Sequence, residues 1–309
     1  MNRQERLDLL SQQKFLQARL MELPESARIM RISTESRLRA IAERLASEPT
    51  DEREPARVRL TFDGAPVIRS YGIFADFGAK AVSGFTDAVV MVAASLTAPL
   101  KATGPIPNRE MNQLIITNTA LGSFGFELEE FSAGQLPFDE QSSVELALER
   151  TQGLLQATVG GDDELLADAA AGLDQRAIDK IRGFIGILVD NEAICAMSFR
   201  DRAFRFSDVG QVRHSLDRIS RDNLVEEEVL LEGEFQGVLS KPRTFQMDLG
   251  AALGVITGKV AKPVDDLDAM NRDLSYRRVR ARLQKTQVRN GRPRYVLLEK
   301  PTRLDDAQE

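Results

Sequence analysis

The sequence is poor in the side chains on which most catalytic and metal sites depend. Its 309 residues include one cysteine, one histidine and no tryptophan. A single cysteine cannot form an internal disulfide, and one histidine cannot supply the paired ligands of a zinc site. Cys195 lies in the apolar run 193–197, which predicts a buried and unreactive thiol. His214 lies on a predicted helix without a positioned partner, so we expect it at the surface rather than in a catalytic role.

A phosphate-binding loop and a long apolar segment are also absent from the sequence. No Gly-x-x-x-x-Gly-Lys-Ser/Thr motif occurs, and Gly160-Gly161 separates two predicted helices without a preceding strand. No window approaches about 18 uninterrupted apolar residues, so no membrane contact is expected. The first residues of the chain are followed by no apolar signal core, which predicts a cytoplasmic protein. We predict no cofactor and no resident metal ion.

Carboxylates are the one catalytic group present in quantity. Glu127 and Glu129 are two residues apart on one predicted strand and therefore face the same side, as a pair of magnesium ligands would. A solvated hairpin face produces the same spacing, and we prefer that interpretation because magnesium sites usually draw ligands from several elements. A magnesium-dependent enzyme acting on nucleic acid or nucleotide remains an alternative, with Glu127 and Asp201 as the residues to test.

What the sequence does contain is a strong separation of charge. The chain carries a net charge of −6, yet residues 275–303 hold one acidic side chain, Glu299, and ten basic ones. An acidic body with a basic end indicates an anionic partner at that end. The ten basic residues are Arg277, Arg278, Arg280, Arg282, Lys285, Arg289, Arg292, Arg294, Lys300 and Arg303.

The hydrophobic pattern predicts an α+β protein of several parts. Residues 1–50 show interspersed charges and two narrow apolar stripes, which are typical of a helical hairpin or short coiled coil. Residues 56–222 mix antiparallel hairpins with grouped helices, so they form an α+β body rather than an alternating α/β sheet. Residues 223–232, with the charge run of Glu226, Glu227 and Glu228, are expected to be a solvated joint, and residues 301–309 a polar tail.

Residues 229–300 predict a small, basic, OB-like β-barrel. Three strands, a helix and two strands are the element order of an OB barrel, which binds oligonucleotides on a strand face and in its loops. A turn at Asn290-Gly291 joins the last two strands. The expected strands are 234–239, 244–248, 253–260, 279–288 and 294–298, and the expected helix is 264–274.

The best candidate site is a basic face on this barrel. In an extended strand Arg278, Arg280 and Arg282 project from one side, while the apolar residues between them face the core. Arginines neutralise phosphates, and aromatic side chains stack on the bases of a single strand. The predicted nucleic-acid-binding residues are Arg278, Arg280, Arg282, Lys285, Arg289, Arg292, Arg294, Tyr276 and Tyr295.

This basic surface is compatible with two kinds of partner. We prefer nucleic acid, with single strands favoured, which makes the protein a non-catalytic or accessory nucleic-acid-binding protein. Alternatively, the barrel docks on acidic residues of its own body or of another subunit, and the protein is an oligomeric scaffold or assembly protein. With either function we expect a homo-oligomer, or a protein partner, at the N-terminal helices.

Overall fold

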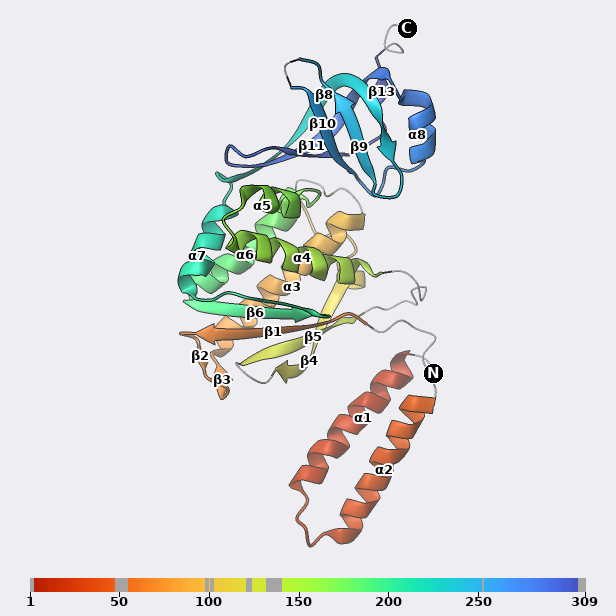
Figure 1. Cartoon of the computed structure of the whole chain (residues 1–309). Coiled ribbons are helices and arrows are strands. Elements are labelled where there is room, and N and C mark those ends of the chain that lie inside the picture. Colours follow the sequence, from red (N-terminus) through yellow and green to blue (C-terminus); the bar gives the residue numbers. More distant parts are fainter. Residues whose placement is uncertain are drawn as a thin grey trace. The chain divides into compact units, whose positions relative to one another are not determined.

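The computed structural model describes residues 3–47, 55–97, 100, 103–120, 124–131, 141–251 and 253–304. They fall into two compact units, one within Met1–Glu54 and the other within Pro55–Ser132 and Gln141–Glu309. The second unit holds both the body and the barrel. The predicted α+β architecture, with a helical hairpin, a mixed body and a small C-terminal barrel, is confirmed (Figure 1). Residues 305–309 of the predicted polar tail lie outside the described part.

The first unit is a helical hairpin with a small apolar core. Helix α1 spans Arg3–Glu22 and helix α2 spans Arg28–Ser47. The buried core of the pair is formed by Leu9, Leu16 and Ile41. Two helices bury little apolar surface when they pack only on each other, so most of the stripe residues of this hairpin stay partly accessible.

The body is built on an antiparallel sheet of five strands in the order β4-β5-β1-β6-β7. In the central strand β1, the side chains of Val58, Leu60 and Phe62 are buried, and the residues between them point to the other face. A two-stranded ribbon of β2 and β3 follows β1. The strands are β1 (Arg57–Gly64), β2 (Val67–Ile68), β3 (Gly72–Ile73), β4 (Gln113–Ala120), β5 (Phe124–Phe131), β6 (Ala193–Phe199) and β7 (Arg202–Arg205).

Helices cover one face of this sheet (Figure 1). Helix α3 packs on α4 and α6, where the rings of Phe85 and Phe184 meet edge to face at 5.5 Å between centroids. Ser142 and Asp162 cap α4 and α5, because their side-chain oxygens accept hydrogen bonds from backbone amides in the first turn of each helix. The helices are α3 (Ala75–Thr97), the 3₁₀ helix η1 (Arg109–Asn112), α4 (Ser143–Val159), α5 (Asp163–Ala170), α6 (Gln175–Asp190) and α7 (Val209–Arg218).

Helix α3 has the length and mean hydropathy of a membrane-spanning helix. In the structure it is the central helix of the body, and Phe85, Val89 and Val92 are completely buried in the core. A helix that is covered on several sides needs the same apolar composition. Packing within the body therefore accounts for the hydropathy of α3.

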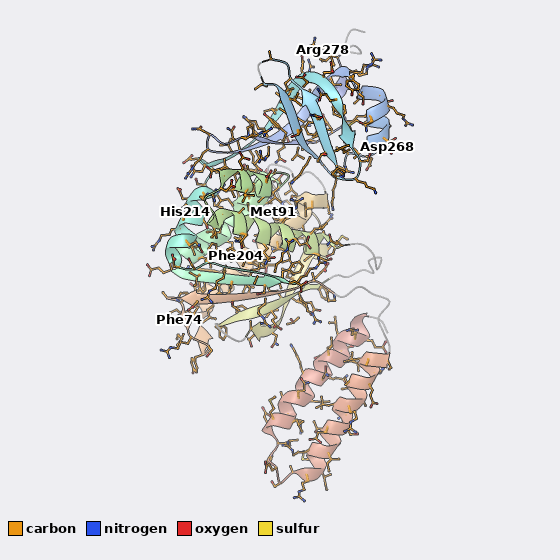
Figure 2. All side chains as sticks on the ribbon, viewed as in Figure 1. Phe74, Met91, Phe204, His214, Asp268 and Arg278 are labelled. Atoms are coloured by element: carbon orange, nitrogen blue, oxygen red, sulfur yellow. The ribbon has the colours of Figure 1, made fainter. Side chains whose placement is uncertain are left out.

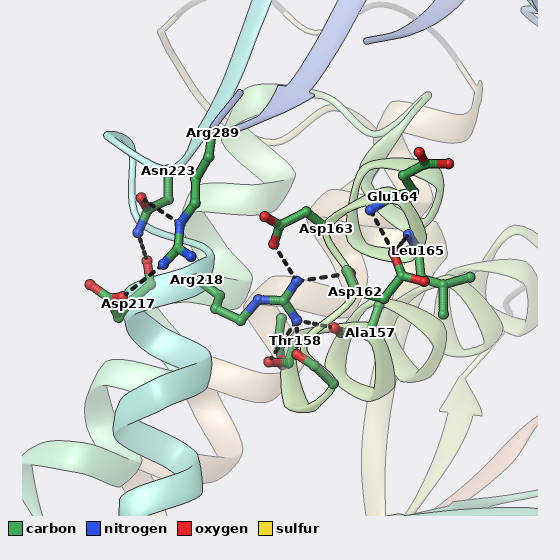
Figure 3. Close-up of polar contacts among 11 residues, drawn as sticks. Ala157, Thr158, Asp162, Asp163, Glu164, Leu165, Asp217, Arg218, Asn223 and Arg289 are labelled. Atoms are coloured by element: carbon green, nitrogen blue, oxygen red, sulfur yellow. Dashed lines mark hydrogen bonds and ion pairs between the residues drawn. The ribbon is translucent and has the colours of Figure 1, made fainter. Parts of the chain in front are cut away.

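A buried arginine fastens α7 to the turn between α4 and α5 (Figure 3). The side chain of Arg218 is 2% exposed and donates hydrogen bonds to the carbonyl oxygens of Ala157, Gly160 and Asp162. It also pairs with the carboxylate of Asp163 at 2.8 Å. The last carbonyl groups of a helix have no partner within the helix, so the guanidinium satisfies acceptors that would otherwise be buried unpaired.

The barrel is a mixed sheet in the order β12-β10-β9-β8-β11-β13, closed by a further pairing of β11 with β12. Strands β10 and β12 pair in parallel, whereas the other neighbours are antiparallel. Phe235, Phe245, Met247 and Leu283 are buried inside it. The order of three strands, a helix and two strands confirms the predicted OB-like arrangement. Its elements are β8 (Leu224–Leu239), β9 (Thr244–Asp248), β10 (Val255–Val260), α8 (Leu267–Leu274), β11 (Arg277–Val288), β12 (Arg294–Leu297) and β13 (Thr302–Arg303).

Strand β8 is much longer than the sequence predicted. It begins at Leu224 instead of Glu234 and pairs with β11 along the whole length of that strand. The joint expected at residues 223–232 is thus part of a two-stranded ribbon, in which Glu227 and Glu228 are exposed as expected, whereas Glu226 is partly buried. Leu224 and Val288, which lie opposite each other at the end of the ribbon, are buried in the core of the body. The ribbon thus ties the barrel to the body.

Candidate nucleic-acid interface

Strand β11 carries a short row of arginines on its outer face, as the alternation of its residues predicted. Arg278, Arg280 and Arg282 are exposed, whereas Val279 and Ala281 are buried in the barrel. Figure 2 shows Arg278 on the outside of the barrel. The row stops at Arg282, since the next residues of the same face contact the body.

The body covers the second half of this strand face. Gln284 Nε2 donates a hydrogen bond to the carbonyl oxygen of Leu173 over 2.9 Å, and Thr286 and Val288 are buried. Lys285 has the opposite parity and therefore lies on the other face of the ribbon, away from the arginine row. Lys285, one of the predicted nucleic-acid-binding residues, therefore lies apart from the arginine row.

Carboxylates of β8 already pair with much of this charge. The hydrogen bond with Glu228 raises the pKa of Arg282 above its ordinary value, so this guanidinium stays charged. Exposed pairs of this kind contribute only about 0–1 kcal/mol, which leaves the cations able to exchange a carboxylate for a phosphate. The pairs between β11 and β8 are Arg280–Glu232 at 2.7 Å, Arg282–Glu228 at 2.6 Å and Lys285–Glu227 at 2.7 Å.

Two other predicted contact residues hold the barrel to the body. Arg294 lies 2.5 Å from Asp168 and 3.1 Å from Glu164, and both carboxylates belong to α5. Arg289 lies 3.6 Å from Asp217 at the end of α7 (Figure 3). These are contacts within the chain, of the kind that the alternative interpretation of the basic end predicted.

The two candidate stacking residues differ in exposure. Tyr295 is 8% exposed and belongs to the barrel core, so little of its ring is open to a base. Tyr276 is 74% exposed. It follows α8 and adopts a positive φ of 59°, in the turn where the chain enters β11. Tyr276 is therefore the aromatic residue of the predicted set that an unstacked base can reach.

Three arginines close to Tyr276 in the chain have no carboxylate partner among the described residues. Within the described part of the barrel, Arg272, Arg277 and Arg278 form no ion pair. Arg272 and Arg277 line a hollow of about 660 Å³ together with Lys300 and Arg303. The one carboxylate in its lining, that of Asp273, pairs with Lys300 at 3.0 Å. We call Arg272, Tyr276, Arg277, Arg278, Lys300 and Arg303 the Tyr276 surface.

Sequence reasoning missed part of this surface. Arg272 lies on α8 and Arg303 on β13, and neither was in the predicted set. Strand β13 pairs with the beginning of β11, and α8 contacts β11, so closure of the barrel brings these elements together. The density of basic residues over 275–303 was the available signal, whereas the contribution of α8 depends on the tertiary fold.

Of the carboxylates considered as magnesium ligands, Glu127 and Glu129 form ion pairs with arginines, and Asp201 lies in the turn of a different hairpin. Glu127 pairs with Arg59 at 2.9 Å and Glu129 with Arg57 at 3.0 Å, each across the β1–β5 pairing. The expectation of a wet acidic face is wrong for Glu129, whose side chain is buried under Arg57. Asp201 is exposed in the turn between β6 and β7. Across the residues that the structure describes, no group of three or more His, Cys, Asp or Glu side chains could hold a metal ion.

The single cysteine and the single histidine lie where the sequence predicted. Cys195 is buried in β6, and burial raises the pKa of its thiol far above the usual range, which makes it a poor nucleophile. His214 lies on the exposed side of α7 (Figure 2).

Comparison of the chain with protein-family models, with curated proteins and with solved structures finds no match.

Proposed function

We propose that the protein binds single-stranded nucleic acid through the Tyr276 surface of its barrel. The observation that carries this proposal is that the exposed ring of Tyr276 directly precedes Arg277 and Arg278, which, like Arg272, form no ion pair in the described barrel. Stacking of a base on an aromatic side chain stabilises a complex by about 1–3 kcal/mol, and the neighbouring arginines neutralise the phosphates on either side of that base. The surface combines the two groups that such recognition needs.

The arginine row extends this surface along β11. Arg280 and Arg282 are exposed and held by weak ion pairs, so a strand that enters at Tyr276 can continue over them. In this proposal Arg289 and Arg294 hold the barrel to the body and do not contact nucleic acid, because their carboxylate partners lie on the body. The binding set is thus Tyr276, Arg277 and Arg278 with Arg272, Arg280 and Arg282 beside them.

The test is binding of a fluorescent single-stranded oligonucleotide by anisotropy. We expect the double variant Arg277→Ala, Arg278→Ala to bind about ten-fold or more weakly than wild type, since each lost charged hydrogen bond is worth about 1.5–3 kcal/mol. Tyr276→Ala should weaken binding, whereas Tyr276→Phe keeps the ring and should bind like wild type. The control is Arg202→Ala, Arg213→Ala, which removes the same charge from exposed positions of the body. Equal affinities of the two double variants would contradict the proposal.

A second candidate function, that of an oligomeric scaffold, is favoured by the helical hairpin. The hairpin has a small buried core, while Phe15, Met21, Ile29 and Ile32 are exposed. Exposed apolar side chains in this number on two helices are typical of an association surface. A second copy of the hairpin, packed as in a four-helix bundle, would cover them. The oligomeric state of the full chain in solution tests this candidate.

A further inference from the structure

A cavity of about 580 Å³ lies where β9, β10 and β12 of the barrel meet helix α5. Its barrel wall includes Thr244, strand β10 and residues 292–295, and its body wall includes Asp168 and Ala171. Both walls belong to the same compact unit. Cavities of roughly 300–1,000 Å³ are typical of small-ligand sites, so this one can hold a molecule of nucleotide size.

Basic side chains of the barrel line this cavity. Lys259 of β10 and Arg292 of the β11–β12 loop line it, together with Arg294. Lys259 also lines an adjoining cavity of about 310 Å³, whose lining includes Arg150 of α4. Arg294 is neutralised by the carboxylates of α5, of which Asp168 is the closer at 2.5 Å.

The other three cations have no carboxylate partner. In the described parts of the second unit, Lys259, Arg150 and Arg292 form no ion pair. The side chain of Lys259 is exposed as a whole, but its pKa is lowered by partial desolvation near the ammonium group and by repulsion from Arg150. The nearby carboxylate of Asp168 opposes this shift, and Arg294 adds a smaller repulsion. Like charges gathered around a hollow destabilise one another until an anion is bound, which is why such arrangements occur at binding sites.

We propose that this cavity binds an organic phosphate of nucleotide size. Lys259 and Arg292, which both line the cavity, would hold the phosphate, because charge-assisted hydrogen bonds from ammonium and guanidinium groups suit its oxygens. The hydroxyls of Thr244 and Thr257 lie in the same lining and can donate to it.

The rest of the cavity suits the organic part of such a ligand. Leu253 and Val255 line it and are both exposed to solvent, and Pro293 lies beside them. An apolar wall next to a phosphate subsite is the usual combination in sites for small phosphorylated molecules. The cavity shares no lining residue with the hollow of the Tyr276 surface, so this site goes beyond the proposed function and does not depend on it.

The experiment is calorimetric titration of the full chain at low salt with three probes. They are inorganic tripolyphosphate, a nucleoside triphosphate and a single-stranded oligonucleotide. We expect the nucleoside triphosphate to bind. Lys259→Met should lower the affinity about ten-fold, whereas Lys259→Arg should keep the affinity within a few-fold of wild type, because Arg preserves the charge. Lys241→Met is the matched control, at an exposed position in the turn between β8 and β9.

The variants separate this site from the Tyr276 surface and identify the source of the phosphate. Arg277→Ala, Arg278→Ala should leave the triphosphate affinity unchanged even if it abolishes oligonucleotide binding. If Lys259→Met weakens the oligonucleotide and no free triphosphate binds, the phosphates recognised here belong to a nucleic-acid strand. If Lys259→Met lowers the affinity for none of the three probes more than Lys241→Met does, the cavity is no phosphate site and the proposal is wrong.

Discussion

At the scale of single residues, the direction of a side chain on a strand could be predicted, but its partner could not. Arg280 and Arg282 point outward because alternation along β11 is a local property. Glu232 precedes Arg280 by 48 residues, and only the register of β8 against β11 brings these two side chains together. The same register places Glu234 opposite Arg278, but in the described barrel only Arg280 of these two arginines forms an ion pair.

The register of β8 against β11 also buries the carboxyl group of Glu226. It was expected in a solvated run, yet it lies on the ribbon face that the body covers, and Oε2 is buried without a hydrogen-bond partner in the described structure. Burial, followed by repulsion from Asp174, raises the pKa of Glu226 from its ordinary value of 4.5 to about 8. The folded state thus favours the protonated carboxyl at neutral pH.

This shift predicts a pH dependence of stability. Because the pKa of Glu226 is higher in the folded than in the unfolded protein, its contribution is fully present below pH 4.5 and is lost as pH rises through about 8. Between pH 4.5 and about 8 the free energy of unfolding should fall by up to about 1.4 kcal/mol per pH unit. Glu226→Gln should flatten this slope in urea denaturation at pH 5.5, 7 and 8.5.

Glu227 supplies the control for that measurement. It lies next to Glu226 but is exposed and pairs with Lys285 at 2.7 Å. Glu227→Gln should keep the slope of the wild-type protein, because an exposed pair contributes little to the free energy of unfolding. A slope that is the same in wild type and Glu226→Gln would show that this carboxyl titrates in the folded state as it does in water.

At the scale of elements, most helices and strands could be predicted from periodicity, and the barrel from its element order. Strands β9 and β12 begin at their predicted positions because turns and apolar spacing are local signals. The first half of β8 could not be predicted, since Glu226, Glu227 and Glu228 in sequence suggest a solvated run. Pairing with β11 gives Glu227 and Glu228 basic partners and buries Glu226 against the body.

The closure of the barrel between β10 and β12 allows a prediction at this scale. A Cβ atom on Gly258 would lie 2.3 Å from the carbonyl oxygen of Tyr295 and 2.5 Å from the ring of Phe245. Gly258→Ala should therefore force these strands apart and reduce the free energy of unfolding by about 1–3 kcal/mol in urea denaturation. Gly153 on α4 is the control, because a Cβ there meets nothing within 4 Å.

The control substitution is expected to change the free energy of unfolding in the opposite direction. Gly153→Ala should raise the free energy of unfolding by about 0.5–1 kcal/mol, since alanine loses less backbone entropy in a helix than glycine does. If Gly258→Ala were as stable as wild type, the parallel contact of β10 with β12 would be looser than the structure shows.

At the scale of the whole molecule, the sequence predicted the parts but not how β8 and β11 join two of them. The ends of this ribbon, Leu224 and Val288, are buried in the core of the body, so the body and the barrel form one compact unit. The helical hairpin is a separate unit with its own small core. A two-helix unit of this size buries little apolar surface by itself.

The scaffold candidate predicts that the mass of the particle depends on the hairpin. Ile29→Glu, Ile32→Glu should lower the mass of the full chain in light scattering, because charges on an association surface oppose burial. Ile68→Glu, at an exposed position on the body, is the control and should leave the mass unchanged. A monomeric wild-type protein at high concentration would contradict this candidate.

The measurement that tests the central claim most directly is the salt dependence of oligonucleotide binding. If the Tyr276 surface and the arginine row contact about five phosphates, the logarithm of the binding constant should fall with the logarithm of salt concentration with a slope of about −3.5. Arg277→Ala, Arg278→Ala should reduce the magnitude of this slope by about 1.4, because two phosphate contacts are lost. Absence of binding at low salt, or an unchanged slope in this variant, would contradict the account and leave the basic barrel as a surface for protein contacts.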